Sequence, residues 1–267
     1  MYDMIIGGFI DMMDPEGARR RADAHRQWCR DQLHLAEPWR DDIKGKKVLV
    51  IKAETYKPIR LFPRVKRCRM VNVNDATMKQ IVTSPTGKWG YVEKICPPAM
   101  DIPLAYGRER GVVIFDDEVI IPALFEEGGG ERWKLSPWMS ITPMEMMTLR
   151  PGTKRAKGHT IVAGLGLGHQ LIEVSRRRQV TKITLVERDK ELVDWLLPVI
   201  HGYMGHARHS MEVVVGDAYK VMPKMRADVA LVDIFPGFGG NEYRRDELRK
   251  TCPNIGFIWG WGCGAYR

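Results

Sequence analysis

Three glycines at alternate positions form a loop that could bring the backbone close to a ligand. Gly164, Gly166 and Gly168 follow a short apolar run, residues 161–163, and His169 comes directly after them. Because glycine has no Cβ, the chain can turn tightly here and present its N–H groups to a bound molecule. A helix that starts at the loop would direct further N–H groups at the same point. Tight turns use the same residues, so the loop alone does not separate a binding site from a turn.

Three acidic residues stand at the ends of apolar runs further along the chain. Glu187 comes 19 residues after Gly168, Asp217 is followed by Ala218 in a Gly-Asp-Ala sequence, and Asp233 ends another run. A carboxylate about 20 residues after a glycine loop can accept the hydroxyl groups of a ribose. Asp217 could contact the amino group of an adenine, and Asp233 would lie beside a reacting group. The order of these residues indicates a nucleotide site.

Each of these residues also has a purely structural interpretation. Glu187 could cap a helix or face solvent, and Asp217 could stabilise a turn. Asp233 could bind backbone N–H groups of the loop that follows it. His169 could be a solvent-facing residue in the first turn of a helix, although the helix dipole there would also keep a ligand-facing imidazole neutral.

The C-terminal part of the sequence alternates apolar runs with amphipathic segments. We expect strands at 159–163, 182–186, 211–215 and 228–233, and helices at 168–178, 190–200 and 219–225. Strands that alternate with helices at this spacing predict a parallel sheet, whose ligands bind at the carboxyl ends of the strands. Few residues follow Asp233, so the sheet should be shortened there or completed by a strand at 256–260.

The N-terminal part of the sequence has a different pattern of apolar and polar residues. Residues 15–35 have a helical pattern, whereas residues 46–124 contain short runs rich in Val and Ile that prolines interrupt. Residues 112–115 and 119–121, on either side of an acidic turn, predict a β-hairpin. The sequence therefore predicts an α/β protein with three segments: a helical segment at 1–45, a smaller β-rich domain at 46–135, and a Rossmann-like domain at 136–267.

A capping motif marks the helix that should precede the parallel sheet. Thr142 and Glu145 have the spacing of a capping box, and Pro143 occupies the position that proline favours at a helix start. We expect this helix to begin at Thr142 and to end near Arg150, because a Pro-Gly pair follows it.

From residue 159 to 236 the sequence resembles the Rossmann-like S-adenosylmethionine-dependent methyltransferase superfamily. The Gly-x-Gly-x-Gly loop, the acid after the second strand, the Gly-Asp-Ala sequence and the aspartate after the fourth strand match in order. The loop lacks the Gly-x-Gly-x-x-Gly spacing typical of dinucleotide sites. The resemblance implies that S-adenosylmethionine is the cofactor and that Asp233 is the candidate catalytic residue. It implies a cofactor site formed by Gly164, Gly166, Gly168, His169, Glu187, Asp217, Ala218 and Asp233.

A narrower resemblance extends to spermidine synthases and to uncharacterised methyltransferase-like proteins of phages and bacteria. Residues 113–118 and Met144-Glu145-Met146 are similar to a hairpin and a helix of spermidine synthases. The sequence departs from them at Pro143, where they have tyrosine, and at Ile120 or Ile121, where they have glutamine. It also lacks their second aspartate after Asp233, which is expected to deprotonate the amine nucleophile. These departures count against polyamine synthesis.

Composition limits the remaining possibilities. The net charge of +9 is spread along the chain, so binding to nucleic acid is compatible with the sequence but not indicated by it. The five cysteines lack Cys-x-x-Cys spacing, and no acid or cysteine with ligand spacing accompanies His201, His206 and His209, so no metal site is predicted. No apolar run reaches the roughly 20 residues of a membrane span. We expect a soluble, cytoplasmic protein without a membrane partner, and a homo-oligomer is compatible with the sequence.

Three hypotheses follow for the function. The first is an S-adenosylmethionine-dependent methyltransferase whose acceptor, a small molecule or a macromolecule, the sequence does not name. The second is a spermidine-synthase-like aminopropyltransferase that uses decarboxylated S-adenosylmethionine. The third is a non-catalytic nucleotide-binding module. The aromatic residues at 257–261 could stack on nucleic-acid bases, but core or edge packing is the stronger interpretation.

Overall fold

The computed structural model describes residues 39–41, 47–62, 68–69, 81–98, 100, 102–106, 109–126, 137–235 and 239–263. The chain divides into two compact units. The N-terminal unit comprises Met1–Thr83, Gly90–Ala105 and Glu109–Met144, and the C-terminal unit comprises Ser84–Trp89, Tyr106–Arg108 and Glu145–Arg267. The predicted helix at 15–35 lies outside the described residues, and the predicted division into three segments stays a prediction.

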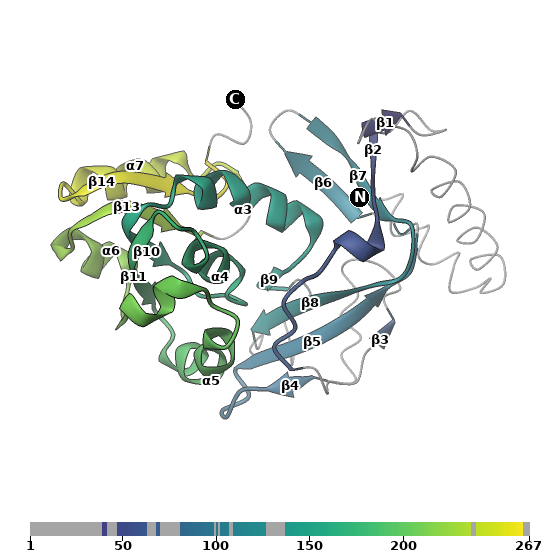
Figure 1. Ribbon diagram of the computed structural model, residues 1–267, viewed down its shortest axis with the longest axis horizontal. Coiled ribbons are helices and arrows are strands. Elements are labelled where there is room, and N and C mark those ends of the chain that lie inside the picture. Colours follow the sequence, from purple (N-terminus) through teal and green to yellow (C-terminus); the bar gives the residue numbers. More distant parts are fainter. Residues whose placement is uncertain are drawn as a thin grey trace. The chain divides into compact units, whose positions relative to one another are not determined.

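The N-terminal unit is built from two β-sheets (Figure 1). One has the strand order β1-β2-β7-β6, and in the other β3-β5-β8-β9 follow one another, with β4 also paired to β5. The bounds are β1 Trp39–Asp41, β2 Lys47–Ile51, β3 Cys68–Arg69, β4 Val82–Thr83, β5 Trp89–Cys96, β6 Ile102–Tyr106, β7 Glu109–Phe115, β8 Val119–Glu126 and β9 Met139–Ser140. A short 3-10 helix, η1, spans Ala53–Thr55. The expected β-rich character is therefore present.

The predicted β-hairpin at 112–121 is wrong, because its two strands belong to different sheets. β7 pairs with β2 in parallel, whereas β8 pairs with β9. The turn between β7 and β8 is attached elsewhere: the Asp116 carboxylate accepts the Ala53 N–H over 2.7 Å, and the Asp116 N–H donates to Ile51. These contacts hold the turn against η1 and β2, so the chain crosses from one sheet to the other instead of folding back.

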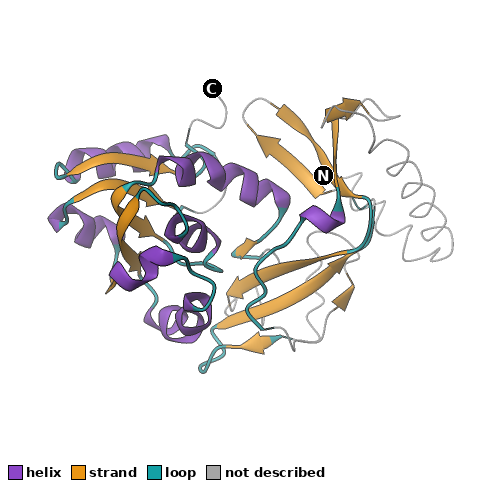
Figure 2. Cartoon of the chain, viewed as in Figure 1, coloured by secondary structure: helices purple, strands orange, loops and turns teal. Residues whose placement is uncertain are grey.

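A five-stranded parallel sheet forms the centre of the C-terminal unit (Figure 2). Its order is β12-β11-β10-β13-β14, with the bounds β10 Gly158–Ala163, β11 Val180–Glu187, β12 Met211–Val215, β13 Ala227–Val232 and β14 Ile255–Gly260. Chain order therefore reverses between β10 and β13. This is the arrangement of a Rossmann-like sheet, in which ligands bind where the order reverses.

Helices cover both faces of this sheet (Figure 1). They are α3 Pro143–Arg155, α4 His169–Ser175, α5 Lys190–His201, α6 Ala218–Val221 and α7 Glu242–Thr251, with the 3-10 helices η2 His206–Ser210 and η3 Met222–Lys224. Alternate strand residues such as Ala163 and Val232 pack with Met222 and Leu248 of η3 and α7 in one buried cluster. The other residues of each strand face α3, α4 and α5.

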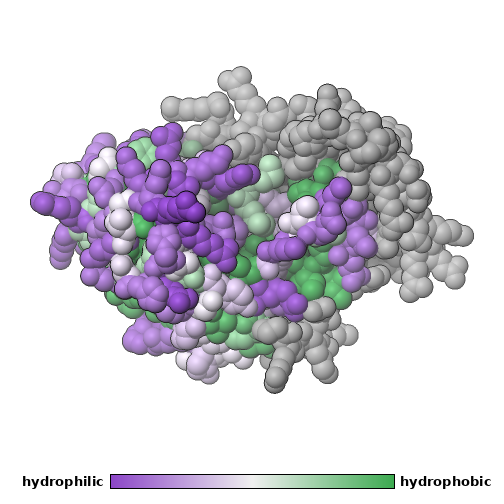
Figure 3. Space-filling model, viewed as in Figure 1, coloured by the Kyte–Doolittle hydropathy of each residue, from purple (hydrophilic) through white to green (hydrophobic). Residues whose placement is uncertain are grey.

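Several predicted elements agree with the structure almost residue by residue. β12 has the predicted bounds, α5 ends one residue later than expected, and β14 supplies the strand predicted at 256–260. α7 is almost wholly polar, and hydrophilic side chains (purple) predominate over this part of the surface in Figure 3. None of the helices in the described ranges is long and apolar enough to cross a membrane.

Three predicted helices differ from the structure in their extent. α3 begins at Pro143, one residue after the expected start at Thr142, and continues through Pro151 to Arg155 instead of ending near Arg150. A Cβ on Gly152 would lie 2.4 Å from the Trp259 ring, so this part of α3 packs directly on β14. Such tertiary packing overrides the local preference of a Pro-Gly pair to end a helix. α4 ends at Ser175, three residues early, and the predicted helix at 219–225 consists of α6 and η3.

Candidate functional site

The parallel register brings the predicted site residues to one edge of the sheet. Ala163 pairs with Val186 on β11 and with Val232 on β13, and Glu187 pairs with Val215 on β12. Residues that directly follow these strand ends therefore lie side by side. The Asp233 N–H donates to Ala163 and the Gly216 N–H to Glu187, at 2.9 and 2.8 Å.

All three glycines of the loop have left-handed backbone conformations. The φ angles are +99° at Gly164, +49° at Gly166 and +78° at Gly168. A Cβ on Gly164 would lie 2.2 Å from the Asp233 carbonyl oxygen, and one on Gly168 would lie 2.7 Å from the Ile200 side chain. The glycines are thus needed for a tight turn and for close packing, which is the structural interpretation. Gly164 and Gly166 are only partly buried, so part of the loop backbone remains accessible.

Glu187 links this loop to the beginning of α5. Its Oε2 accepts the Leu165 N–H over 2.8 Å, and its Oε1 accepts the Asp189 N–H over 2.9 Å. The cap of α5 is Asp189, whose carboxylate accepts the Leu192 N–H, so Glu187 is not the helix cap. Each carboxylate oxygen can accept a second hydrogen bond. Glu187 is therefore held in place and retains the capacity to accept two hydroxyl groups.

Asp217 and Ala218 have structural roles at the next strand end. Asp217 is the N-cap of α6, and its Oδ1 accepts the Tyr219 N–H over 3.0 Å. Ala218 is buried in the cluster between α6 and the sheet. The turn-stabilising interpretation of Asp217 is thus confirmed, and its contact with an adenine stays a prediction.

Asp233 has a different environment from the other acids. It follows β13 at the point where chain order reverses, and burial raises the pKa of its carboxyl group to about 7. Among the described residues, its carboxylate has no hydrogen-bond partner, so the alternative in which it holds loop N–H groups finds no support there. A carboxyl group with such a pKa can exchange a proton near neutral pH.

His169 and Gln170 form the first turn of α4. Burial is the main cause that lowers the pKa of His169, and the Arg176 charge lowers it further against the opposing effect of Glu173. The imidazole is thus expected to be neutral at pH 7, mainly because of burial. Gln170 is only 6% exposed, and neither atom of its amide has a hydrogen-bond partner among the residues that the structure describes. Sequence reasoning missed Gln170, since nothing in the sequence signals a buried amide without partners.

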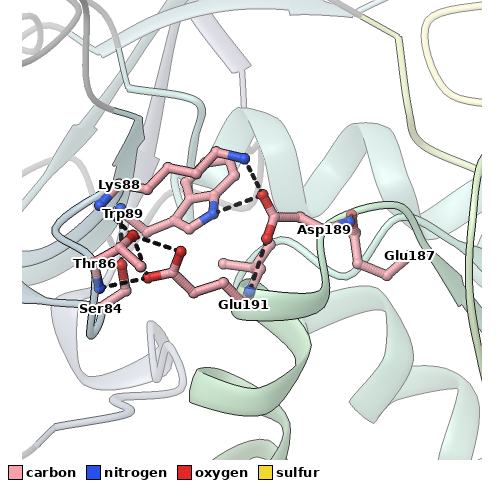
Figure 4. A network of polar contacts seen from close by, with 8 residues as sticks. Ser84, Thr86, Lys88, Trp89, Glu187, Asp189 and Glu191 are labelled. Carbon is pink, nitrogen blue, oxygen red and sulfur yellow. Dashed lines mark hydrogen bonds and ion pairs between the residues drawn. The ribbon is translucent and has the colours of Figure 1, made fainter.

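A polar network that the sequence did not predict adjoins Glu187 (Figure 4). It joins the segment Ser84–Trp89 to the first turn of α5, and all its residues belong to the C-terminal unit. The Trp89 Nε1 and Lys88 Nζ both donate to the Asp189 carboxylate. The two parts are about 100 residues apart in sequence, which is why no local pattern reveals the network.

The histidines and the C-terminal aromatic residues do not contribute to this edge. His206 and His209 lie in η2 before β12, and the described part of the chain contains no group of three potential metal ligands. Arg155 lies over the Phe257 ring at 5.5 Å, and the Trp261 Nε1 donates to Thr148 Oγ1 over 3.0 Å. These aromatic residues pack on α3, in agreement with the interpretation of core or edge packing.

The comparisons with known proteins give similarities to solved structures alone. No family model matches the chain, and no curated protein matches it in sequence. A precorrin 8w decarboxylase from Methanobacterium thermoautotrophicum is 19% identical, with a TM-score of 0.33, over 45% of this chain and 62% of that one. The spermidine synthase of Thermotoga maritima is 16% identical, with a TM-score of 0.35, over 51% of this chain and 49% of that one.

A third similar structure is an S-adenosylmethionine-dependent methyltransferase from Geobacter sulfurreducens in complex with S-adenosylhomocysteine. It is 16% identical, with a TM-score of 0.33, over 45% of this chain and 48% of that one. The chain thus spans between about half and three fifths of these proteins. Both kinds of protein that the sequence resembles are among these structures.

Proposed function

We propose that the chain binds S-adenosylmethionine at the carboxyl edge of the parallel sheet and transfers its methyl group to an acceptor. The observation that carries this proposal is the position of Glu187. Its carboxylate is fixed by the Leu165 and Asp189 N–H groups, next to the glycine loop and at the edge where such sheets bind ligands. The spare acceptor capacity of its two oxygens suits the two hydroxyl groups of a ribose.

The other residues at this edge fit the remainder of such a ligand. The loop offers backbone at the partly buried Gly164 and Gly166, against which the methionine part would lie. Asp217 follows the neighbouring strand, where it could accept a hydrogen bond from the adenine amino group. The buried Gln170 amide has no partner in the described part of the chain, which costs about 1–3 kcal/mol unless a ligand or a water supplies one.

In such a reaction the protein would mainly position the cofactor and the acceptor. S-adenosylmethionine, when bound, supplies a methyl group on a positively charged sulfur, and transfer requires in-line attack by the acceptor. The chain would hold both reactants and exclude water. Asp233, whose pKa is about 7, would accept the proton that an acceptor loses as it attacks, and the neutral His169 would line the site without repelling the positive sulfur.

Calorimetric titration with S-adenosylmethionine tests the proposal directly. Glu187→Gln should weaken binding about tenfold or more, because a neutral amide replaces the carboxylate that accepts both hydroxyl groups. The matched control is Glu173→Gln on α4, since Glu173 is an exposed acid that pairs with Arg176. NAD and decarboxylated S-adenosylmethionine complete the set of ligands.

The three ligands separate the three hypotheses. Preference for S-adenosylmethionine, lost in Glu187→Gln alone, supports the methyltransferase and justifies a screen of small and macromolecular acceptors. Tighter binding of the decarboxylated form would favour an aminopropyltransferase instead. Absence of binding by the wild type would reject both enzymes.

A further inference from the structure

The segment Ser84–Trp89 is attached to the C-terminal unit at two points (Figure 4). At the first point, the Thr86 N–H and hydroxyl donate to the Glu191 carboxylate over 2.9 and 2.8 Å. At the second point, Lys88 and Trp89 donate to Asp189. Both acceptors belong to the first turn of α5 or to its cap, so the segment fixes that turn from outside.

Asp189 is the junction between this segment and the site. Its Oδ1 caps α5 through the Leu192 N–H, and its Oδ2 accepts the Trp89 Nε1–H over 3.1 Å and a Lys88 hydrogen bond. Its own N–H donates to Glu187. Thus one residue connects Lys88 and Trp89 to the carboxylate that the proposed function requires.

The junction is charged and well shielded. The side chain of Asp189 is 12% exposed and that of Lys88 is 45% exposed. Burial alone would raise the pKa of Asp189, but the hydrogen bonds from Lys88, Leu192 and Trp89 outweigh it, so the net pKa is lowered. Lys88 also lies 5.5 Å from the centre of the Trp89 ring. The ion pair therefore persists at neutral pH, and partial shielding strengthens it compared with a fully exposed pair.

Glu187 depends on this junction because Asp189 supplies one of the two backbone N–H groups that hold its carboxylate. Of its two backbone donors, one is Leu165 in the tightly packed glycine loop. Asp189 is the donor on a capped helix. If Asp189 moves, the Glu187 carboxylate can rotate away from the position in which it accepts two hydroxyl groups, and misplacement of about 1 Å is costly at such sites.

We propose that Lys88 and Trp89 are positioning residues that set the affinity for the adenosyl ligand by holding Asp189 and, through it, the Glu187 carboxylate. This inference rests on the proposed function, and it adds a segment some 100 residues upstream of Glu187 to the determinants of that site. Lys88 and Trp89 act through Asp189, so neither is expected to contact the ligand itself.

Two variants test this role without removing Glu187 or Asp189. Trp89→Phe retains a buried ring and deletes the indole N–H, and Lys88→Met retains the aliphatic chain and deletes the charge. The control is Lys190→Met, because Lys190 is a more exposed lysine on α5 that pairs with Asp194 at 2.5 Å, away from the junction. Combining Lys88→Met and Trp89→Phe should raise the Kd for S-adenosylhomocysteine about tenfold, with no change in the control.

A measurement without ligand separates positioning from a general loss of stability. NMR hydrogen exchange should be faster at the Leu165 and Asp189 amides in Lys88→Met and Trp89→Phe than in Lys190→Met, while the amides of β10 remain protected. Unchanged Kd and unchanged exchange in both variants would overturn the inference. Faster exchange throughout the sheet would also overturn it, since it would indicate ordinary destabilisation.

The Kd and the hydrogen-exchange rates together distinguish a failure of this inference from a failure of the proposed function. If the wild type binds S-adenosylhomocysteine and the double variant binds equally well, the inference alone fails. If the wild type does not bind, the proposed function fails and the claim about affinity falls with it. Hydrogen exchange then still decides whether Lys88 and Trp89 hold the Glu187 donors in place.

Discussion

The two edges of the parallel sheet use a glycine beside an aspartate in contrasting ways. At the amino edge, Gly158 has a φ of +53°, and a Cβ there would lie 2.1 Å from the Asp228 carboxylate. That carboxylate accepts the His159 N–H over 2.8 Å. At the carboxyl edge, Gly164 approaches the main-chain oxygen of Asp233 instead. At the amino edge the glycine therefore lies against an aspartate carboxylate. At the carboxyl edge it lies against the main-chain oxygen of an aspartate instead of the carboxylate.

The two edges also differ in the surroundings of their acidic side chains. The amino edge carries an open pocket of about 490 Å³, with the basic residues Lys157 and Arg226 in its lining, and the Asp228 carboxylate there accepts the His159 N–H. The carboxyl edge has Asp233, whose pKa is about 7, and Glu187 with spare acceptor capacity. This contrast supports the proposal that the chemistry takes place at the carboxyl edge.

Replacement of the two aspartates should give the largest difference in activity between the two edges. Asp233→Asn is expected to lower kcat/KM roughly a thousandfold with the acceptor found in the screen, because loss of a general base typically costs 10²- to 10⁴-fold. Binding of S-adenosylhomocysteine should be retained. Asp228→Asn should leave kcat/KM unchanged, and an equal loss in both variants would show that the edges do not differ in this way.

The two glycines should differ in their effect on stability. Gly164→Ala is expected to lower the free energy of unfolding by about 3 kcal/mol, because its Cβ meets a fixed main-chain oxygen and its φ is strained for alanine. Gly158→Ala should cost about 1–2 kcal/mol, since the Asp228 side chain can rotate and a φ near +53° is less strained. Urea denaturation measures both values. The reverse order would mean that the close approach at Gly164 is not rigid.

The pH dependence of activity should sharpen the contrast. A base works in its deprotonated form, so kcat/KM should rise about tenfold per pH unit below the pKa of Asp233, about 7, and level off above it. The pKa of Asp233 is raised in the folded state. At pH values between the ordinary pKa of an aspartate and about 7, the folded state therefore retains a proton that the unfolded state has released. Stability should therefore fall as pH rises through this window, and less so in Asp233→Asn. A flat profile below pH 7 would exclude Asp233 as the base.

The smallest effect is expected from the amino-edge acid itself. Asp228→Asn should lower the free energy of unfolding by about 1 kcal/mol, because the amide oxygen can still accept the His159 N–H but without a charge. Thermal unfolding at pH 7 measures this change. A loss as large as that of Gly164→Ala would show that the carboxylate supports the sheet more than its single hydrogen bond suggests.

Local patterns predicted the central sheet and the positions of its acids well. β12, α5 and β14 follow from apolar periodicity, and parallel strands necessarily bring Glu187 and Asp233 to one edge. Two of the failures involve partners distant in sequence. Asp116 is bound by η1 instead of closing a hairpin, and Pro151 remains helical because Gly152 packs on Trp259.

The same limit applies to the candidate site. The glycine loop and its acids could be found from spacing alone, but their supports could not. Lys88 and Trp89 reach Asp189 across about 100 residues, and the missing partners of Gln170 depend on the folded surroundings of α4. Sequence thus indicates which groups can bind, and the fold decides which groups hold them.

The packing of α3 on the last strand has a consequence for synthesis on the ribosome. Thr148 and its partner Trp261 are 113 residues apart, and Gly152 packs closely on the ring of Trp259, which is similarly distant in sequence. At about 5–20 residues per second, roughly 6 to 20 seconds separate the translation of the helix from that of its partners. During that interval the Pro-Gly pair lacks the contacts that keep it helical. The second half of α3 should therefore acquire its final shape late, after the central strands have left the exit tunnel.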